Sequence, residues 1–112
     1  MSYDIDLIIN TGKGRMVSAV YIGNFTYNAQ PHFEAASGPE YFEIKSPRDL
    51  NGMRAADALL HLERIVFNTE NDPKIKQIPF ANNWGDFDSW LRFLQDWRDL
   101  CRDHPATIVS VN

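Results

Sequence analysis

The sequence predicts a small α+β domain, with a three-stranded antiparallel sheet and helices packed on one face. An alternating apolar pattern near the N-terminus, three segments of helical periodicity and a β-rich run at the C-terminus support this, in the order β-β-α-α-α-β. The chain has 112 residues, which is a common size for one domain. We therefore expect a single domain over residues 1–112.

The three predicted strands lie at the two ends of the chain. Apolar and polar residues alternate over Tyr3–Ile9, and the glycine-containing turn Thr11–Arg15 leads to a second strand, Met16–Ile22. We expect Gly23-Asn24 to end that strand. Its apolar residues fall on both faces, so we expect it to be the more buried of the two. Ala106–Val111 is the third strand and returns to the sheet.

Two helices are predicted in the middle of the chain. In the first, Ala29, Phe33 and Ala36 recur at helical spacing before Gly38-Pro39. The second begins near Met53 or Arg54 and ends before a proline. Its expected core stripe, widened by Leu62 and Ile65, is Ala56, Leu59, Leu60, Glu63, Val66 and Phe67.

The third helix has the clearest periodicity. Its apolar residues follow the 3.6-residue period: Phe87, Trp90, Leu91, Leu94, Trp97, Leu100 and Cys101. Asp86 or Asp88 suits a cap or first-turn position, and His104-Pro105 ends the helix. Phe93 falls off this stripe and is predicted to be an exposed aromatic.

Composition argues against several classes of protein. Fifteen acidic residues against eleven basic ones give a formal charge of −4, without the basic patch that nucleic-acid binding requires. No stretch has the length of a membrane span, and the single Cys101 excludes an intrachain disulfide. We therefore expect a soluble, cytoplasmic protein that contacts neither nucleic acid nor membrane.

The sequence contains no recognisable catalytic or metal-binding constellation. The three histidines lie at no known ligand spacing, and Gly12–Arg15 is followed by a strand where a phosphate-binding loop needs a helix. Two acid pairs, Asp4 with Asp6 and Asp86 with Asp88, imply no pocket that would separate their pKa values. We predict no catalytic residues, no metal ligands and no cofactor.

The remaining candidate site consists of two polar–aromatic segments, Tyr21–Asn28 and Asn82–Asp86. Aromatic rings beside side-chain amides suit a small ligand or a protein partner. The alternative is local: the same residues cap helices and plug the core. If both segments meet, they form a polar–aromatic cleft, and its predicted binding residues are Asn24, Thr26, Tyr27, Asn28, Asn83, Trp84 and Asp86.

These segments also carry a family resemblance. Tyr21–Asn28, Asp49–Met53, Asn83–Asp86 and Ala106–Ile108 resemble the pattern GN-[YF]-T-x-N, D-L-x-G and N-G-W-G-D of a family of small uncharacterised phage and prophage proteins. The resemblance covers nearly the whole chain and departs from the pattern at Asn83, where the family has glycine. It implies a phage-type accessory role in the host cytoplasm, without an implied activity.

Three functions remain open from the sequence. The first is a non-enzymatic accessory protein that binds a host protein or a small ligand through the cleft, with inhibition of host defence as one such role. The second is a small hydrolase or transferase that uses Asp86 with Asn24 or Tyr27. The third is an immunity-like protein whose acidic surface neutralises a basic toxin. An exposed edge strand would also allow a homodimer.

Overall fold

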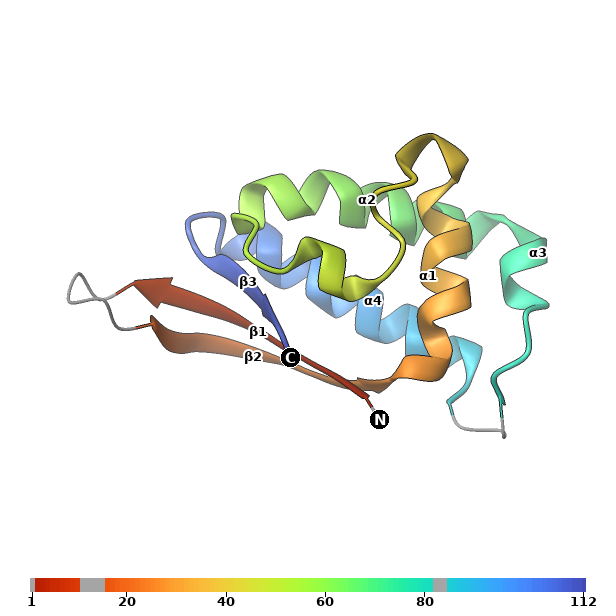
Figure 1. The fold of residues 1–112 in the computed structure, drawn as a ribbon, viewed down its shortest axis with the longest axis horizontal. Coiled ribbons are helices and arrows are strands. Elements are labelled where there is room, and N and C mark those ends of the chain that lie inside the picture. The colour runs from red at the N-terminus through yellow and green to blue at the C-terminus, as the bar shows by residue number, and fades with distance from the viewer. Residues whose placement is uncertain (1, 11–15, 82–84) are drawn as a thin grey trace.

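A three-stranded antiparallel sheet forms one layer of the fold, and the helices cover one of its faces (Figure 1). The computed structural model describes residues 2–10, 16–81 and 85–112. The central strand β1 (Ser2–Asn10) lies between β2 (Met16–Thr26) and β3 (Ile108–Val111). This confirms the predicted α+β class. The predicted turn at residues 11–15 lies outside the described residues.

The central strand, and not β2, is the more buried of the first two strands. Tyr3, Ile5 and Leu7 of β1 are buried against the helices, whereas Val17 and Tyr21 of β2 are 47% and 59% exposed. The expectation for β2 was wrong because β2 is an edge strand and projects beyond the helices (Figure 1). It also continues past Gly23-Asn24 to Thr26, with a register shift opposite Ile5 and Asp6.

Within the described ranges, β2 is followed by the α-helices α1 (Gln30–Ser37), α2 (Ala55–Asn71), α3 (Pro73–Lys76) and α4 (Phe87–Asp103). Among the described residues, 3₁₀ turns include η1 (Tyr27–Ala29), η2 (Pro39–Tyr41) and η3 (Pro47–Leu50). The core positions expected for the first helix, Ala29, Phe33 and Ala36, are confirmed as buried, and Ala29 lies in η1 just before α1. No helix in the described ranges is long and apolar enough to cross a membrane.

The buried face of α2 agrees only in part with the predicted stripe. Leu62, Ile65 and Val66 are buried as expected, but Leu60 and Phe67 are 68% and 63% exposed. The buried arc packs against α1, α4 and β3 and consists of Ala55, Ala58, Leu62, Ile65, Val66 and Thr69. Because α2 has apolar residues on two arcs, its periodicity alone did not show which arc meets the core.

The helix α4 supplies the aromatic centre of the core. Trp90, Leu94, Trp97 and Cys101 are buried as predicted. Phe93, expected to be exposed, is only 9% exposed, because β2 crosses this side of the helix. Its ring packs 5.6 Å from the ring of Phe25 on β2, measured between centroids.

Candidate functional site

The first predicted segment lies where β2 passes into η1. Thr26 caps that turn, and its Oγ1 accepts a hydrogen bond from the backbone N–H of Asn28 at 3.2 Å. Asn24 donates from Nδ2 to Ser2 Oγ at 2.9 Å. The ring of Tyr27 packs against that of Tyr3, with centroids 4.5 Å apart and the ring planes tilted by 50°.

The second predicted segment leads into α4. Asp86 is the N-cap of this helix: Oδ1 accepts from the Ser89 backbone N–H at 2.9 Å, and Oδ2 accepts from Ser89 Oγ at 2.8 Å. These hydrogen bonds lower the pKa of the Asp86 carboxyl below its usual value. Asn83 and Trp84 lie outside the described residues.

The two segments meet in space, although more than fifty residues of chain separate them. Asn28 Nδ2 donates a hydrogen bond to the carbonyl oxygen of Ala81 at 2.9 Å. Gly85 has a φ of +97°, and a Cβ at this position would lie 3.0 Å from both Thr26 Cγ2 and Phe80 Cδ1. Only glycine therefore fits this close approach without strain. We call the surface formed by Thr26, Asn28, Phe80, Ala81 and Gly85 the junction.

Only part of the predicted residue set gathers at the junction. Thr26 and Asn28 contact it directly. Asn24 is engaged with Ser2, and Tyr27 with Tyr3 and Arg48, whose guanidinium donates to the Tyr27 hydroxyl and lies 5.2 Å from the ring centroid. Of the predicted residues that the structure describes, Thr26 and Asn28 thus lie at the junction, whereas Asn24, Tyr27 and Asp86 are engaged in contacts outside it.

Sequence reasoning missed the residues that support the junction from inside. His32 is fully buried, its ring stacks on Phe80 with centroids 4.1 Å apart, and its Nε2 lies 2.8 Å from the Ile78 carbonyl oxygen. The one feature of the sequence that pointed to such contacts is the unusual length of the connection between α2 and α4.

Three hollows lie elsewhere on the described surface. One of about 360 Å³ lies between α2 and α4 and is lined by Glu63, Phe67, Glu70, Arg98 and Arg102. A second of about 380 Å³ lies beside Phe42, and a third of about 380 Å³ lies between the end of α2 and the start of α4. None of the three is lined by a predicted site residue.

Two observations concern the reactive and metal-ligating side chains of the described residues. Burial raises the pKa of the Cys101 thiol to about 12, so the thiolate nucleophile is disfavoured. Within residues 2–10, 16–81 and 85–112, no three His, Cys, Asp or Glu side chains are grouped so that they could hold a metal ion.

These features define a small α+β protein with a junction between a strand end and a helix entrance. Comparison with models of protein families, with curated proteins and with solved structures finds no match. The phage-type resemblance therefore stays a prediction.

Proposed function

We propose that this chain is a non-enzymatic binding protein, of the accessory type that phages carry, and that the junction takes part in binding. The observation that carries the proposal is the convergence of the two polar–aromatic segments: Thr26 lies close to Gly85, and Asn28 donates a hydrogen bond to Ala81, the residue just before the second segment. A surface held by such contacts before binding loses less entropy when a partner docks. The proposed partner is a protein of the host, such as a defence component, or a small ligand.

The positions of the polar groups favour binding over catalysis. Both carboxylate oxygens of Asp86 accept hydrogen bonds from Ser89, and the lowered pKa makes this carboxylate a weaker base. Asn24 and Tyr27, the proposed catalytic companions of Asp86, have partners of their own. These contacts weigh against a hydrolase or transferase.

A specific observation also supports the immunity-like alternative. Tyr3, Ile5 and Leu7 face the helices, so Asp4 and Asp6 point to the uncovered face of the sheet. An acidic sheet face would steer a basic toxin toward it. In that case, the association rate would fall steeply with salt, and replacing both aspartates by asparagine would lower it.

The junction proposal is tested with Asn28→Ala, which removes the hydrogen bond to the Ala81 carbonyl oxygen, and with Trp84→Ala, since Trp84 is the aromatic that the sequence places in the second segment. The immobilised protein and the variants are compared as baits in host lysate, and thermal shifts are measured with nucleotides and metabolites. Phe42→Ala, at a 71% exposed phenylalanine away from the junction, is the matched control.

We expect Asn28→Ala and Trp84→Ala to lose a bound protein or a ligand-induced thermal shift that Phe42→Ala retains. Equal binding by the wild-type protein and all three variants would remove the junction from the proposal. Turnover of a screened metabolite that Asp86→Asn abolishes would replace binding with catalysis.

A further inference from the structure

We propose that two copies of this chain associate through the exposed surface along the seam between α2 and α4. This surface, which we call the α2–α4 face, consists of Leu60, Glu63, Phe67, Glu70, Arg98 and Arg102. It is separate from the junction, so this inference does not depend on the proposed function.

Large apolar side chains are exposed on the α2–α4 face. Leu60 and Phe67 are 68% and 63% exposed and lie seven residues apart, which places them on the same side of α2. Phe67 also lines the hollow of about 360 Å³ between the helices. An exposed aromatic beside a hollow is the kind of anchor that a protein interface buries.

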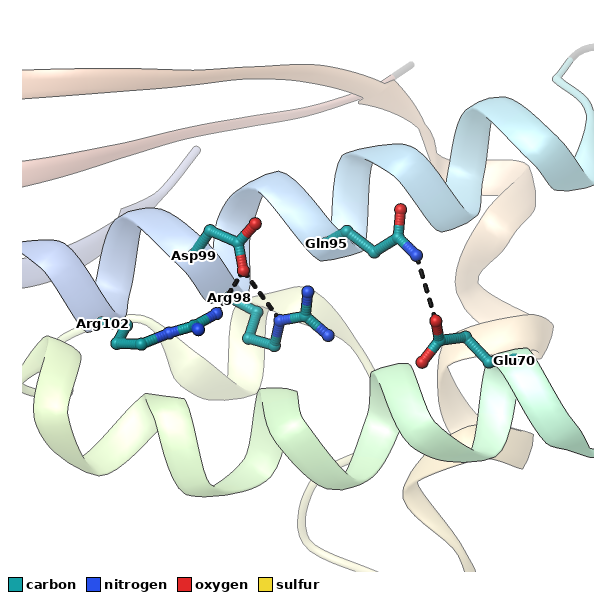
Figure 2. Close-up of polar contacts among 5 residues, drawn as sticks. All are labelled: Glu70, Gln95, Arg98, Asp99 and Arg102. Atoms are coloured by element: carbon teal, nitrogen blue, oxygen red, sulfur yellow. Dashed lines mark hydrogen bonds and ion pairs between the residues drawn. The ribbon is translucent and has the colours of Figure 1, made fainter.

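The two helices lie side by side in a definite antiparallel register. Gln95 Nε2 donates to Glu70 Oε2 at 3.2 Å, which sets the two residues at one level (Figure 2). Seven residues before Glu70 lies Glu63, and seven residues after Gln95 lies Arg102. About two helical turns therefore separate Glu63 from Glu70 on α2, and the same distance separates Arg102 from Gln95 on α4. Glu63 thus lies opposite Arg102 along the seam. By the same count, Phe67 lies opposite Arg98.

Charges of opposite sign line the two sides of this seam. The α2 side carries Glu63 and Glu70, and the α4 side carries Arg98 and Arg102. Both arginines pair with Asp99 on their own helix (Figure 2). Glu63 takes part in none of the ion pairs between described residues. The negative charge of Glu63 on the α2 side is thus left for a positively charged side chain of another molecule to neutralise.

A second copy satisfies this charge pattern through twofold symmetry. A rotation of 180° about an axis along the seam places α2 of one copy over α4 of the other, at the same level. Glu63 then faces Arg102 of the second copy, and Phe67 lies over Arg98 of the second copy, where a cation–π contact is favourable. Each contact occurs twice, as an isologous interface requires. An axis across the seam would instead place α2 against α2, and its acids near one another.

The first experiment measures the molecular mass by sedimentation from micromolar to millimolar concentration. We expect a monomer–dimer equilibrium whose dissociation constant rises on the order of thirtyfold with Phe67→Glu, because a buried aromatic anchor is replaced by a charge. Phe42→Glu alters another largely exposed phenylalanine, outside the α2–α4 face, and should leave the equilibrium unchanged. Circular dichroism checks that each variant is folded.

The second experiment tests the pairing itself with Glu63→Arg and Arg102→Glu. Each variant alone places like charges in both symmetric contacts, so each should dimerise more weakly than the wild type. An equimolar mixture of the two restores opposite charges at both contacts, and we expect heterodimers that form more readily than either homodimer.

Three results would overturn the proposal. They are a wild-type chain that is monomeric at every concentration, a dimer that Phe67→Glu leaves intact, and a charge-swapped mixture with no preference for the heterodimer. The proposal also fails if the α2–α4 face is covered by a different protein and never by a second copy, because the surface then belongs to that partner.

Discussion

At the residue scale, His32 links the first helix to the connection that precedes α4. The side chain is fully buried, contacts the Ile78 carbonyl through Nε2 and has no partner for Nδ1 among the described residues. An unprotonated Nδ1 tolerates this position, whereas a second proton would bring a buried charge. Burial accordingly lowers the pKa of His32 below its usual value.

This lowered pKa predicts a loss of stability on acidification. The unfolded chain binds more protons than the folded one below pH 6.5, the usual pKa of histidine, so the stabilisation is complete above that pH and is lost as the pH falls toward the folded-state pKa. Urea unfolding at several pH values between 7.5 and 5.5 measures the slope of the unfolding free energy against pH. We expect His32→Phe to be less stable at pH 7.5 but to have a shallower slope.

His61→Gln is the matched control, because burial and the neighbouring Arg64 also lower the pKa of His61. The partly exposed His61 should contribute less to the slope than the buried His32. A His32→Phe variant that retains the full wild-type pH dependence would contradict the assignment.

At the scale of elements, the packing of β2 across α4 makes Phe93 a core residue. Its ring lies 5.6 Å from that of Phe25, centroid to centroid, and stacks on that of Trp90 at 5.8 Å. Removal of such a ring leaves a cavity that a packed sheet and helix fill only in part. Phe93 thus contributes to the stability of the fold, although it lies outside the regular apolar stripe of α4.

We expect Phe93→Ala to lower the free energy of unfolding by about 3–5 kcal/mol, the usual cost of a buried phenylalanine. Phe42→Ala removes the same side chain from a 71% exposed position and should change that free energy by about 0.5 kcal/mol or less. Chemical denaturation measures both. Equal losses for the two variants would contradict the packing of β2 on α4.

At the scale of the whole molecule, β3 joins the end of the chain to the middle. It pairs with β1 on one side, and on the other the Gly52 N–H donates to the Val109 carbonyl oxygen at 2.8 Å. Asn51 Oδ1 accepts from the Val111 N–H at 2.8 Å. The start of α2 is thereby attached to the sheet edge, which couples the helical layer to the strands.

This coupling predicts a global effect of one surface amide. Asn51→Ala leaves the Val111 N–H without its partner and should cost about 0.5–1.5 kcal/mol of unfolding free energy, the net value of one hydrogen bond. Hydrogen exchange should quicken at both Val111 and Gly52. Asn71→Ala, which removes a hydrogen bond within α2 to the Phe67 carbonyl oxygen, is the control that should leave these amides unchanged.

The sequence alone determined the elements whose signal is local. The period of α4, the alternation in β1 and the stop at Gly38 follow from side-chain spacing and backbone preference, and the structure confirms them. Asp86 and Asp88 were both predicted as a cap or first-turn acid, and the structure makes Asp86 the cap and places Asp88 in the first turn. The meeting of the two polar–aromatic segments was a conditional prediction. The contacts of Thr26 with Gly85 and of Asn28 with Ala81 agree with this prediction, while Asn83 and Trp84 lie outside the described residues.

Only the tertiary structure decided which side of each element became the core. Leu60 and Phe67 have the spacing of a buried stripe, yet the neighbouring arc of α2 packs on α1 and α4. Phe93 lies off the stripe of α4 and is buried because β2 crosses it, while β2 itself is an exposed edge. Burial depends on which surfaces other elements cover, and this long-range information is absent from the spacing of residues within one element.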